Sequence, residues 1–201
     1  MTDWFEDTFA RAPLMAILRG MGVERSAELS TLAWDLGIDA VEVPLQTAED
    51  DAALREVVRL GEERGKIVGA GTIITVEQLD AAVAAGARYV VSPGLDPAMV
   101  RAAQERGIPI LPGVATPTEV QAAVGLGLTW LKAFPATWLG TGWFAHIRGP
   151  FPQVRFVATG GLSAANVGDY LAAGVRVAAV GSALEDPVQL ERLSDVLAAR
   201  S

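Results

Sequence analysis

The sequence predicts an α/β protein, a single (β/α)8 barrel with a short N-terminal helix, in which residues 1–201 form one domain. Two observations carry this prediction. Helical stretches repeatedly end in a glycine that precedes a short apolar run, and eight such runs follow one another without a long interruption. A chain of 201 residues can bury one sizeable core but is short for two ordinary domains.

The recurring glycines are expected at helix C-termini. Each lies between an alanine- or leucine-rich stretch and an apolar run, where a helix commonly ends in a left-handed residue before the chain reverses. These glycines are Gly37, Gly65, Gly86, Gly107, Gly127 and Gly174.

The apolar runs are short, continuous and rich in β-branched residues, as is typical of parallel strands buried on both faces. Eight units favour a closed barrel over an open doubly wound sheet, which more often has about five or six strands. The strands are expected near residues 14–18, 39–43, 66–71, 88–92, 108–111, 128–133, 154–159 and 176–180.

Several helix starts are also recognisable. Thr75 and Thr116 are each followed three residues later by Gln78 and Glu119, the spacing of a capping box. Residues 1–12 remain outside the repeat. They contain Trp4, Phe5 and Phe9, and we expect an amphipathic helix that covers one end of the barrel.

Composition excludes several functions. The net charge of −8 argues against a nucleic-acid partner, and the absence of cysteine excludes disulfides and thiolate chemistry. The acidic N-terminus has no apolar signal segment, and no run reaches transmembrane length, so we expect a cytoplasmic protein without a membrane partner. The one histidine, His146, is expected to be a packed or surface side chain, and we predict neither a metal site nor a cofactor.

In a barrel of this kind, functional residues collect where the strands end and the following loops begin. Glu42 and Lys132 are charged residues inside apolar strands, and an unpaired buried charge is costly. A structural Glu–Lys pair is one interpretation, but such a pair stabilises a core less well than packed apolar residues. Because Arg19 and Thr72 add polar groups at the same end, a functional site is favoured.

The residue types indicate the chemistry. A lysine in a desolvated pocket can lose its proton near neutral pH, and the neutral amine can attack a ketone or an aldehyde. A neighbouring carboxylate can transfer protons. We therefore predict that Lys132 is an imine-forming nucleophile and that Glu42 is a general acid and base. Gly160, Gly161, Gly181 and Ser182 follow strands seven and eight, the common phosphate-binding position of such barrels.

These residues resemble one family, the 2-keto-3-deoxy-6-phosphogluconate and 2-keto-3-deoxy-6-phosphogalactonate aldolases, which are class I enzymes related to 4-hydroxy-2-oxoglutarate aldolase. The resemblance extends from about residue 13 to residue 190. Its motifs are Ala16-Ile17-Leu18-Arg19-Gly20, Val41-Glu42-Val43, Gly69-Ala70-Gly71-Thr72, Val91-Ser92-Pro93, Leu111 to Glu119, Leu131-Lys132-Ala133-Phe134-Pro135-Ala136, Thr159-Gly160-Gly161 and Val180-Gly181-Ser182.

The resemblance implies a role for each matching position. It assigns the imine to Lys132 and proton transfer to Glu42. Arg19 and Thr72 would bind the substrate carboxylate, Pro93 and Phe134 would line the pocket, and the four residues Gly160, Gly161, Gly181 and Ser182 would hold the phosphate. It further implies cleavage to pyruvate and glyceraldehyde 3-phosphate without a cofactor, and a homotrimer.

Two positions point to different sugars, which differ at C4. Gln46 resembles the galactonate type, whereas Thr159, expected to contact the substrate, resembles the gluconate type, as does the segment 149–152. One side chain near the C4 hydroxyl can decide between the two sugars. The gluconate substrate is favoured, and the galactonate substrate stays open.

Two other functions remain as alternatives. A phosphosugar isomerase or epimerase on the same barrel would use the phosphate loops but would leave Lys132 without a role. A non-catalytic sensor of phosphorylated sugar acids would not need Glu42 and Lys132 together.

Overall fold

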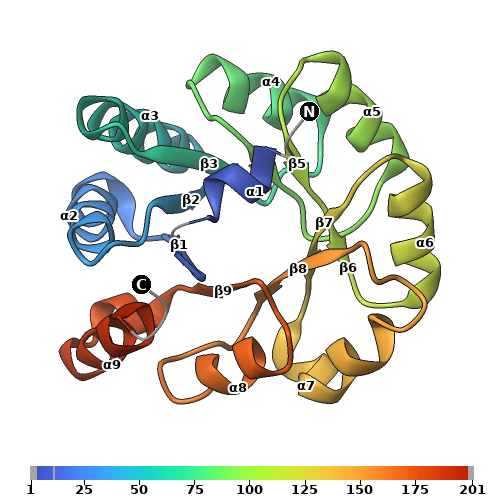
Figure 1. Cartoon of the computed structure of the whole chain (residues 1–201). Coiled ribbons are helices and arrows are strands. Elements are labelled where there is room, and N and C mark those ends of the chain that lie inside the picture. Colours follow the sequence, from blue (N-terminus) through green and yellow to red (C-terminus); the bar gives the residue numbers. More distant parts are fainter. Residues whose placement is uncertain (1–3, 11, 199–201) are drawn as a thin grey trace.

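The computed structural model describes residues 4–10 and 12–198. Nine parallel strands form one sheet in the order β5-β4-β3-β2-β1-β9-β8-β7-β6, and the sheet curls into a nearly closed barrel inside a ring of helices (Figure 1). The strands are β1 (Leu14–Ile17), β2 (Ala40–Pro44), β3 (Ile67–Gly71), β4 (Val90–Val91), β5 (Ile110–Leu111), β6 (Gly113–Val114), β7 (Trp130–Ala133), β8 (Arg155–Thr159) and β9 (Val177–Val180).

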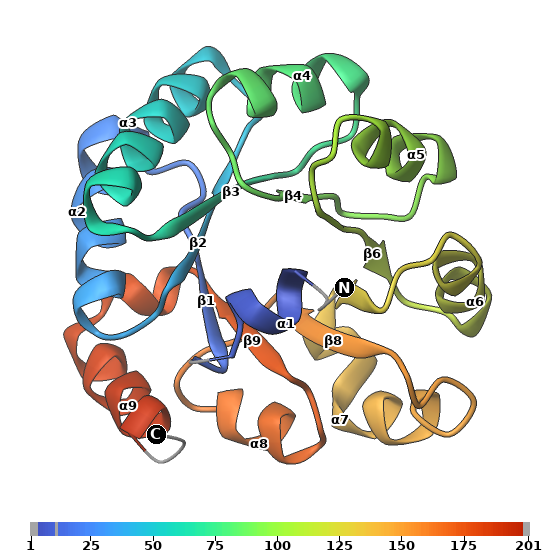
Figure 2. The same ribbon diagram turned by 45° about the horizontal axis from the view of Figure 1, so that its top comes forward.

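The helices that follow the strands cover the outside of the barrel, and α1 lies across one end (Figure 2). The helices are α1 (Trp4–Thr8), α2 (Gly22–Asp35), α3 (Ala48–Arg64), α4 (Val76–Ala84), α5 (Pro97–Glu105), α6 (Pro117–Gly125), α7 (Ala136–Ile147), α8 (Val167–Ala172), the short 3-10 helix η1 (Ser182–Glu185) and α9 (Pro187–Ala198).

The strand count differs from the expected eight. Each predicted run contains a strand, but the chain also pairs at β6, directly after β5, and the two are separated by Pro112. Proline has no N–H to donate to the neighbouring strand, so regular pairing stops there. Because β5 and β6 are the two edges of the sheet and are consecutive in the chain, the barrel is nearly closed at this point.

The local signals are confirmed. All six expected glycines have positive φ, between 65° at Gly65 and 96° at Gly37. Thr75 with Gln78 and Thr116 with Glu119 form capping boxes at the starts of α4 and α6. A third capping box, which the sequence analysis did not identify, joins Thr47 and Asp50 at the start of α3.

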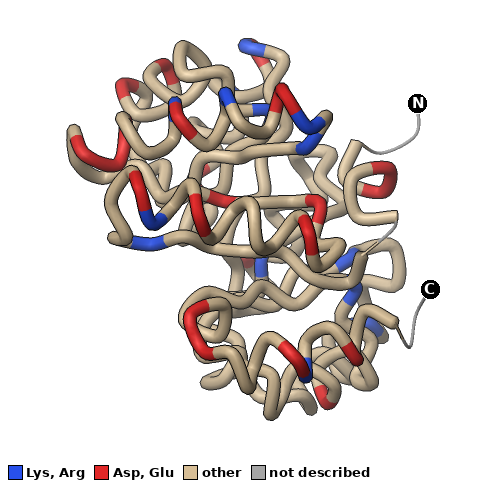
Figure 3. The backbone as a smooth tube through the Cα atoms, turned by 90° about the vertical axis from the view of Figure 1, so that its left-hand side faces the viewer, with Lys and Arg blue, Asp and Glu red and all other residues tan. Residues whose placement is uncertain are grey.

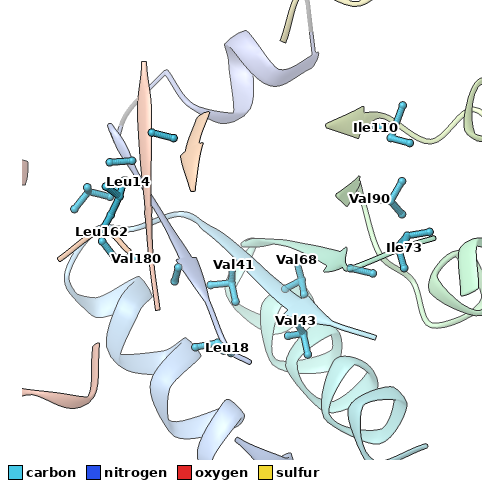
Figure 4. Close-up of a cluster of buried hydrophobic side chains, with 14 of the residues drawn as sticks. Leu14, Leu18, Val41, Val43, Val68, Ile73, Val90, Ile110, Leu162 and Val180 are labelled. Carbon is cyan, nitrogen blue, oxygen red and sulfur yellow. The ribbon is translucent and has the colours of Figure 1, made fainter. Parts of the chain in front are cut away.

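Side chains alternate along the strands between two apolar clusters. One row faces outward and packs against the helices, as Figure 4 shows for Leu14, Val41, Val43 and Val68. The other row fills the barrel interior, which contains Met15, Ile17, Ala40, Tyr89, Val91, Leu111, Trp130, Val157, Val177 and Ala179. Because the alternation has a period of two, continuing the inward row along each strand leads to Arg19, Glu42, Lys132 and Thr159.

Helix α1 lies across one end of the barrel in both ribbon views (Figures 1 and 2). Phe5 and Phe9 are buried, and their rings lie 6.3 and 5.3 Å from that of Trp130. Glu6 forms ion pairs with Arg155 and Arg176. The predicted covering helix is thus confirmed over Trp4–Thr8, Phe9 follows it, and residues 1–3 and 11 lie outside the described residues.

Acidic and basic residues lie mainly along the outer helices (Figure 3). Exposed pairs such as Arg25 with Glu28 contribute little to stability. Within residues 4–10 and 12–198, no helix combines the length and the apolar character needed to cross a membrane.

Candidate active site

Lys132 and Glu42 lie inside the barrel on strands that are not neighbours in the sheet. Lys132 is on β7 and is 3% exposed, while Glu42 is on β2 and is fully buried. Parallel pairing places Glu42 beside Ile17 and Gly69, and Lys132 beside Gly113 and Val157. The strands therefore hold both charged groups in an otherwise apolar interior.

Glycines in β3 make room for the large interior side chains. A Cβ on Gly71 would lie 1.9 Å from Glu42 Oε1, and a Cβ on Gly69 would lie 2.3 Å from the ring of Tyr89. Real Cβ atoms do not approach other atoms this closely, because packed interiors leave no such overlap. The carboxylate of Glu42 thus occupies space that any other residue at position 71 would fill.

Burial shifts both pKa values towards the neutral forms. Desolvation raises the pKa of Glu42, and the nearby charges of Lys132 and Arg19 partly oppose this shift. Desolvation also lowers the pKa of Lys132; the charge of Glu42 opposes that shift and the charge of Arg19 adds to it. Each group is therefore close enough to act on the other.

The arrangement is not a closed structural ion pair. Among the described residues, neither carboxylate oxygen of Glu42 has a hydrogen-bond partner. The Nζ atom of Lys132 lies 5.0 Å from the centre of the Phe134 ring. A pair that served only stability would satisfy its oxygens, because unpaired buried charge is destabilising. The carboxyl group of Glu42 thus has unused hydrogen-bonding capacity inside the barrel.

Arg19 is held at the mouth of the barrel by two side chains. It donates from its guanidinium to Gln46 Oε1 at 3.3 Å and to Thr72 Oγ1 at 3.5 Å. Gln46 is itself fixed, because its N–H donates to Asp50 Oδ2, part of the capping box of α3. Thr72 has a φ of 60°, a strained conformation for a β-branched residue.

A cavity of about 630 Å³ opens at this end of the barrel. Seven of the predicted site residues line it, namely Arg19, Phe134, Thr159, Gly160, Gly161, Gly181 and Ser182. Lys132 and Glu42 do not line the cavity, but each interacts with a residue that does. Lys132 Nζ lies over the ring of Phe134, and Glu42 interacts electrostatically with Arg19. Thr72 and Pro93 are also absent from its described lining, although Thr72 bonds to Arg19.

Six further residues line the same cavity and were not predicted: Ile17, Met21, Leu162, Ser163, Ala179 and Glu185. The alternation of side chains along a strand could have indicated Ile17 and Ala179, because they precede Arg19 and Gly181 by two residues and so point to the same side. The other four lie in loops or in η1, where no periodic pattern indicates which way a side chain points.

Thr159 ends β8 and lines the cavity. It is 5% exposed, and its Oγ1 has no hydrogen-bond partner among the described residues. Gly160 and Gly161 follow with φ of 104° and 77°, and a Cβ on Gly161 would lie 2.5 Å from Thr137 Oγ1. Both glycines are therefore required by backbone conformation, and Gly161 also by space.

A second cavity, of about 610 Å³, lies at the α1 end of the barrel. Its described lining includes Trp4, Glu6, Trp130 and Arg155 but no lysine. No group of three or more histidine, aspartate or glutamate residues in the described ranges could hold a metal ion. His146 is an exposed side chain on α7, and a surface position was one of the two expected for it. The candidate chemistry thus belongs to the cavity beside Arg19 and Phe134.

The chain is similar to known aldolases. Residues 5–197 match the aldolase family described as KDPG and KHG aldolase. A 2-dehydro-3-deoxy-phosphogluconate aldolase of Treponema pallidum (strain Nichols) is 40% identical over 171 residues, 83% of this chain and 79% of that protein. A probable 2-dehydro-3-deoxy-6-phosphogalactonate aldolase of Rhizobium meliloti (strain 1021) is 37% identical over 176 residues, 87% of this chain and 82% of that protein.

Solved structures agree with the sequence matches. The KDPG aldolase from Legionella pneumophila, with pyruvate captured at low pH as a covalent carbinolamine intermediate, is 31% identical to this chain. The two structures superpose with a TM-score of 0.84, and the match covers 100% of each chain.

Proposed function

The chain belongs to the KDPG and KHG aldolase family and is an aldolase, and from this premise we propose that it cleaves 2-keto-3-deoxy-6-phosphogluconate to pyruvate and glyceraldehyde 3-phosphate through a Schiff base on Lys132. The observation that carries the proposal is the buried pair of Lys132 and Glu42. Burial favours the neutral amine of Lys132, and the carboxyl oxygens of Glu42 have no hydrogen-bond partner in the described chain.

The first half of the reaction forms the imine. The lone pair of Lys132 Nζ attacks C2 of the ketone as the C=O π bond breaks, and a proton moves from the nitrogen to the ketone oxygen to give a carbinolamine. Glu42 donates the proton that allows this hydroxyl to leave as water. The raised pKa of Glu42 suits this step, because a carboxyl group must be protonated to act as an acid. The product is a protonated imine that can accept an electron pair.

The second half breaks the C3–C4 bond. Glu42, now a carboxylate, accepts the proton of the C4 hydroxyl, directly or through a bound water molecule. The electrons of the C3–C4 bond flow into the imine, and glyceraldehyde 3-phosphate leaves. The resulting enamine is protonated at C3, and hydrolysis of the imine then releases pyruvate and regenerates the amine of Lys132.

The remaining predicted residues bind the substrate in this proposal. The planar guanidinium of Arg19 binds the carboxylate, with Thr72 beside it, and Pro93 and Phe134 line the pyruvate end. Backbone N–H groups at Gly160, Gly161 and Gly181, with the Ser182 hydroxyl, hold the phosphate. The support for this assignment is that Arg19 and the phosphate residues line one cavity.

The proposed preference for the gluconate configuration at C4 of the substrate is based on Thr159. Its buried hydroxyl has no partner among the described residues, so it is available to a hydroxyl of the substrate. The galactonate epimer is the second candidate, because Gln46, which resembles the galactonate type, contacts Arg19 directly. The two curated relatives described above carry one name of each kind.

We further propose that the protein is a cytoplasmic homotrimer, as the family resemblance implies. Two parts of the barrel that expose large apolar side chains are the candidates for the contact between copies. Trp138 on α7 is 90% exposed, and Ile74 and Val76 at the start of α4 are 60% and 42% exposed. A ring of copies requires contacts between two different patches of the same chain, and these two patches suit that geometry.

We also propose that residues 1–201 form one domain and that β5 and β6 are two parts of one strand of a (β/α)8 barrel. The pairing on either side of Pro112 supports this count. Leu111 O accepts from Ser92 N, and Pro112 O accepts from Lys132 N, so the carbonyls continue to pair with both neighbouring strands across the break.

Reduction with borohydride tests the proposed function. In the presence of pyruvate, we expect covalent trapping on the peptide that contains Lys132 and not on the peptide that contains Lys66. Pyruvate release from the gluconate and galactonate substrates, measured side by side, then tests the C4 preference. A folded protein that forms no adduct on Lys132 would contradict the mechanism, and faster cleavage of the galactonate substrate would reverse the preference.

A further inference from the structure

The proposed phosphate end of the cavity carries a negative charge. Of the described residues that line the cavity, Arg19 and Glu185 are the two with acidic or basic side chains. Arg19 bonds to Gln46 and Thr72, on the side of β2 and β3. Glu185 ends η1, which follows β9, and lies only three residues after Ser182, one of the proposed phosphate-binding residues.

The charge of Glu185 is not neutralised within the described chain. The side chain is exposed and forms no ion pair with residues 4–10 or 12–198. The next residue, Asp186, does have hydrogen-bond partners: its carboxylate accepts from Val188 N at 2.9 Å and from Gln189 Nε2 at 3.3 Å. Of the two consecutive acidic residues, therefore, one caps the last helix and the other faces the cavity.

A carboxylate at this position opposes the binding of a phosphate. A phosphate monoester carries between about −1.5 and −2 charges at neutral pH. The other polar groups beside Glu185 in the cavity lining are the uncharged Ser163 and Ser182, and no lysine or arginine other than Arg19 lines the described cavity. Like charges in one cavity repel, whereas an uncharged hydroxyl at the same place would meet no such repulsion.

We propose that Glu185 is a specificity-determining residue that weakens the binding of a dianionic distal group and so widens the substrate range towards 2-keto-3-deoxy sugar acids with an uncharged distal end. This inference rests on the proposed function, because it takes the cavity beside Ser182 as the distal site. Glu185 acts on the distal group alone, and the reacting carbons lie at the other end of the substrate, near Lys132.

The Glu185→Gln variant tests the inference, because glutamine keeps the shape and removes the charge. We expect KM for the 6-phosphorylated substrate to fall about two- to fivefold, as is reasonable for an exposed charge. KM for the unphosphorylated substrate should change much less. The difference should shrink when the ionic strength rises from about 0.05 M to about 0.5 M, because salt screens exposed charges.

Glu191→Gln is the matched control, since Glu191 is an exposed glutamate on α9 that does not line the cavity. This variant makes the same change in net charge and should leave both KM values as they are. An equal change in KM for both substrates, or the same change in the control, would show that Glu185 does not select the distal group.

Binding of inorganic phosphate separates this inference from the proposed function. Titration calorimetry should show tighter phosphate binding by Glu185→Gln than by the wild-type protein. A wild-type protein that cleaves neither substrate would overturn the proposed function, while the phosphate titration would still decide the role of Glu185. Equal phosphate affinity in the two proteins would overturn the inference even in an active aldolase.

Discussion

At the scale of single residues, Lys132 and Glu42 show how burial changes the chemistry of ordinary side chains. On the surface, a lysine is protonated and a glutamate is ionised at neutral pH, and neither is reactive. Inside the barrel, desolvation works against both charges and shifts the two pKa values towards each other. An amine and a carboxyl group in this state can attack a carbonyl and exchange protons near neutral pH.

The Glu42→Gln variant should keep the fold and lose turnover. Glutamine has the same shape, and it places no charge among apolar neighbours, so the melting temperature should stay the same or rise. Cleavage should fall about 10²- to 10⁴-fold, the usual contribution of a general acid or base. Pyruvate release and thermal unfolding measure the two effects. Near-normal cleavage would reduce Glu42 to a structural residue.

The pH dependence of imine formation should report on Lys132. Its lowered pKa means that the neutral amine forms at lower pH than in an exposed lysine, so trapping at saturating pyruvate should rise with pH and level off below pH 10.5. Arg19 is one cause of the lowering. Its removal in Arg19→Gln should raise the pKa of Lys132 and move the rise to higher pH.

A suitable control for this pH profile is Arg25→Gln, which removes an exposed arginine on α2 that pairs with Glu28. Its profile should match that of the wild-type protein. A profile of Arg19→Gln that moves to lower pH, or that does not move, would show that the charge of Arg19 does not act on Lys132.

At the scale of elements, strand β3 contributes space to the site, because two of its positions are glycines. Its inward positions Gly69 and Gly71 have no side chains, and the ring of Tyr89 and the carboxylate of Glu42 fill the space. The burial that shifts the pKa of Glu42 therefore depends on the neighbouring strand as much as on β2 itself.

Gly71→Ala should consequently damage both stability and activity. The added methyl group would overlap Glu42 Oε1, and relieving this overlap should cost about 1–3 kcal/mol of the free energy of unfolding. The displaced carboxylate should lower cleavage by at least about tenfold. Gly125→Ala at the end of α6 is the control, because nothing lies within 4 Å of its added Cβ. Denaturant unfolding and pyruvate release check both; equal behaviour of the two variants would contradict the argument.

At the scale of the whole molecule, the two ends of the barrel have different tasks. One end is covered by α1, whose Phe5 packs near Trp130 and whose Glu6 pairs with Arg155 and Arg176. The other end carries the cavity that is lined by Arg19 and by the residues at the strand ends. We therefore expect the substrate to bind at the end that carries Arg19.

The exposed Trp138 should mark a contact between copies at the whole-molecule scale. In Trp138→Glu, a charge at the centre of an apolar contact should dissociate the proposed trimer into monomers, which light scattering after size-exclusion chromatography would detect. Val188→Glu is a control, because Val188 is also exposed, at 59%, but lies on α9, away from α7 and α4. A wild-type protein that is already monomeric would contradict the proposal.

The sequence by itself determined the repeating pattern, the helix ends and the motifs around Lys132 and Glu42, because each depends on neighbours only a few residues apart. Glycines at helix ends and capping residues act within a single turn. Those local signals were sufficient to predict a strand within each apolar run. The strand ends and the family motifs together indicated seven residues that line one cavity.

Only the tertiary structure decided how distant residues meet. The space that Gly71 leaves for Glu42 and the bond between Arg19 and Gln46 both depend on segments that are distant in sequence. Pairing on either side of Pro112 depends on the neighbouring strands, and Glu185 lies in η1, where no periodic pattern indicates the direction of its side chain. Closure of the barrel brings β2 and β7 close enough for their charges to interact. The burial that this closure produces is what shifts the pKa values of Lys132 and Glu42.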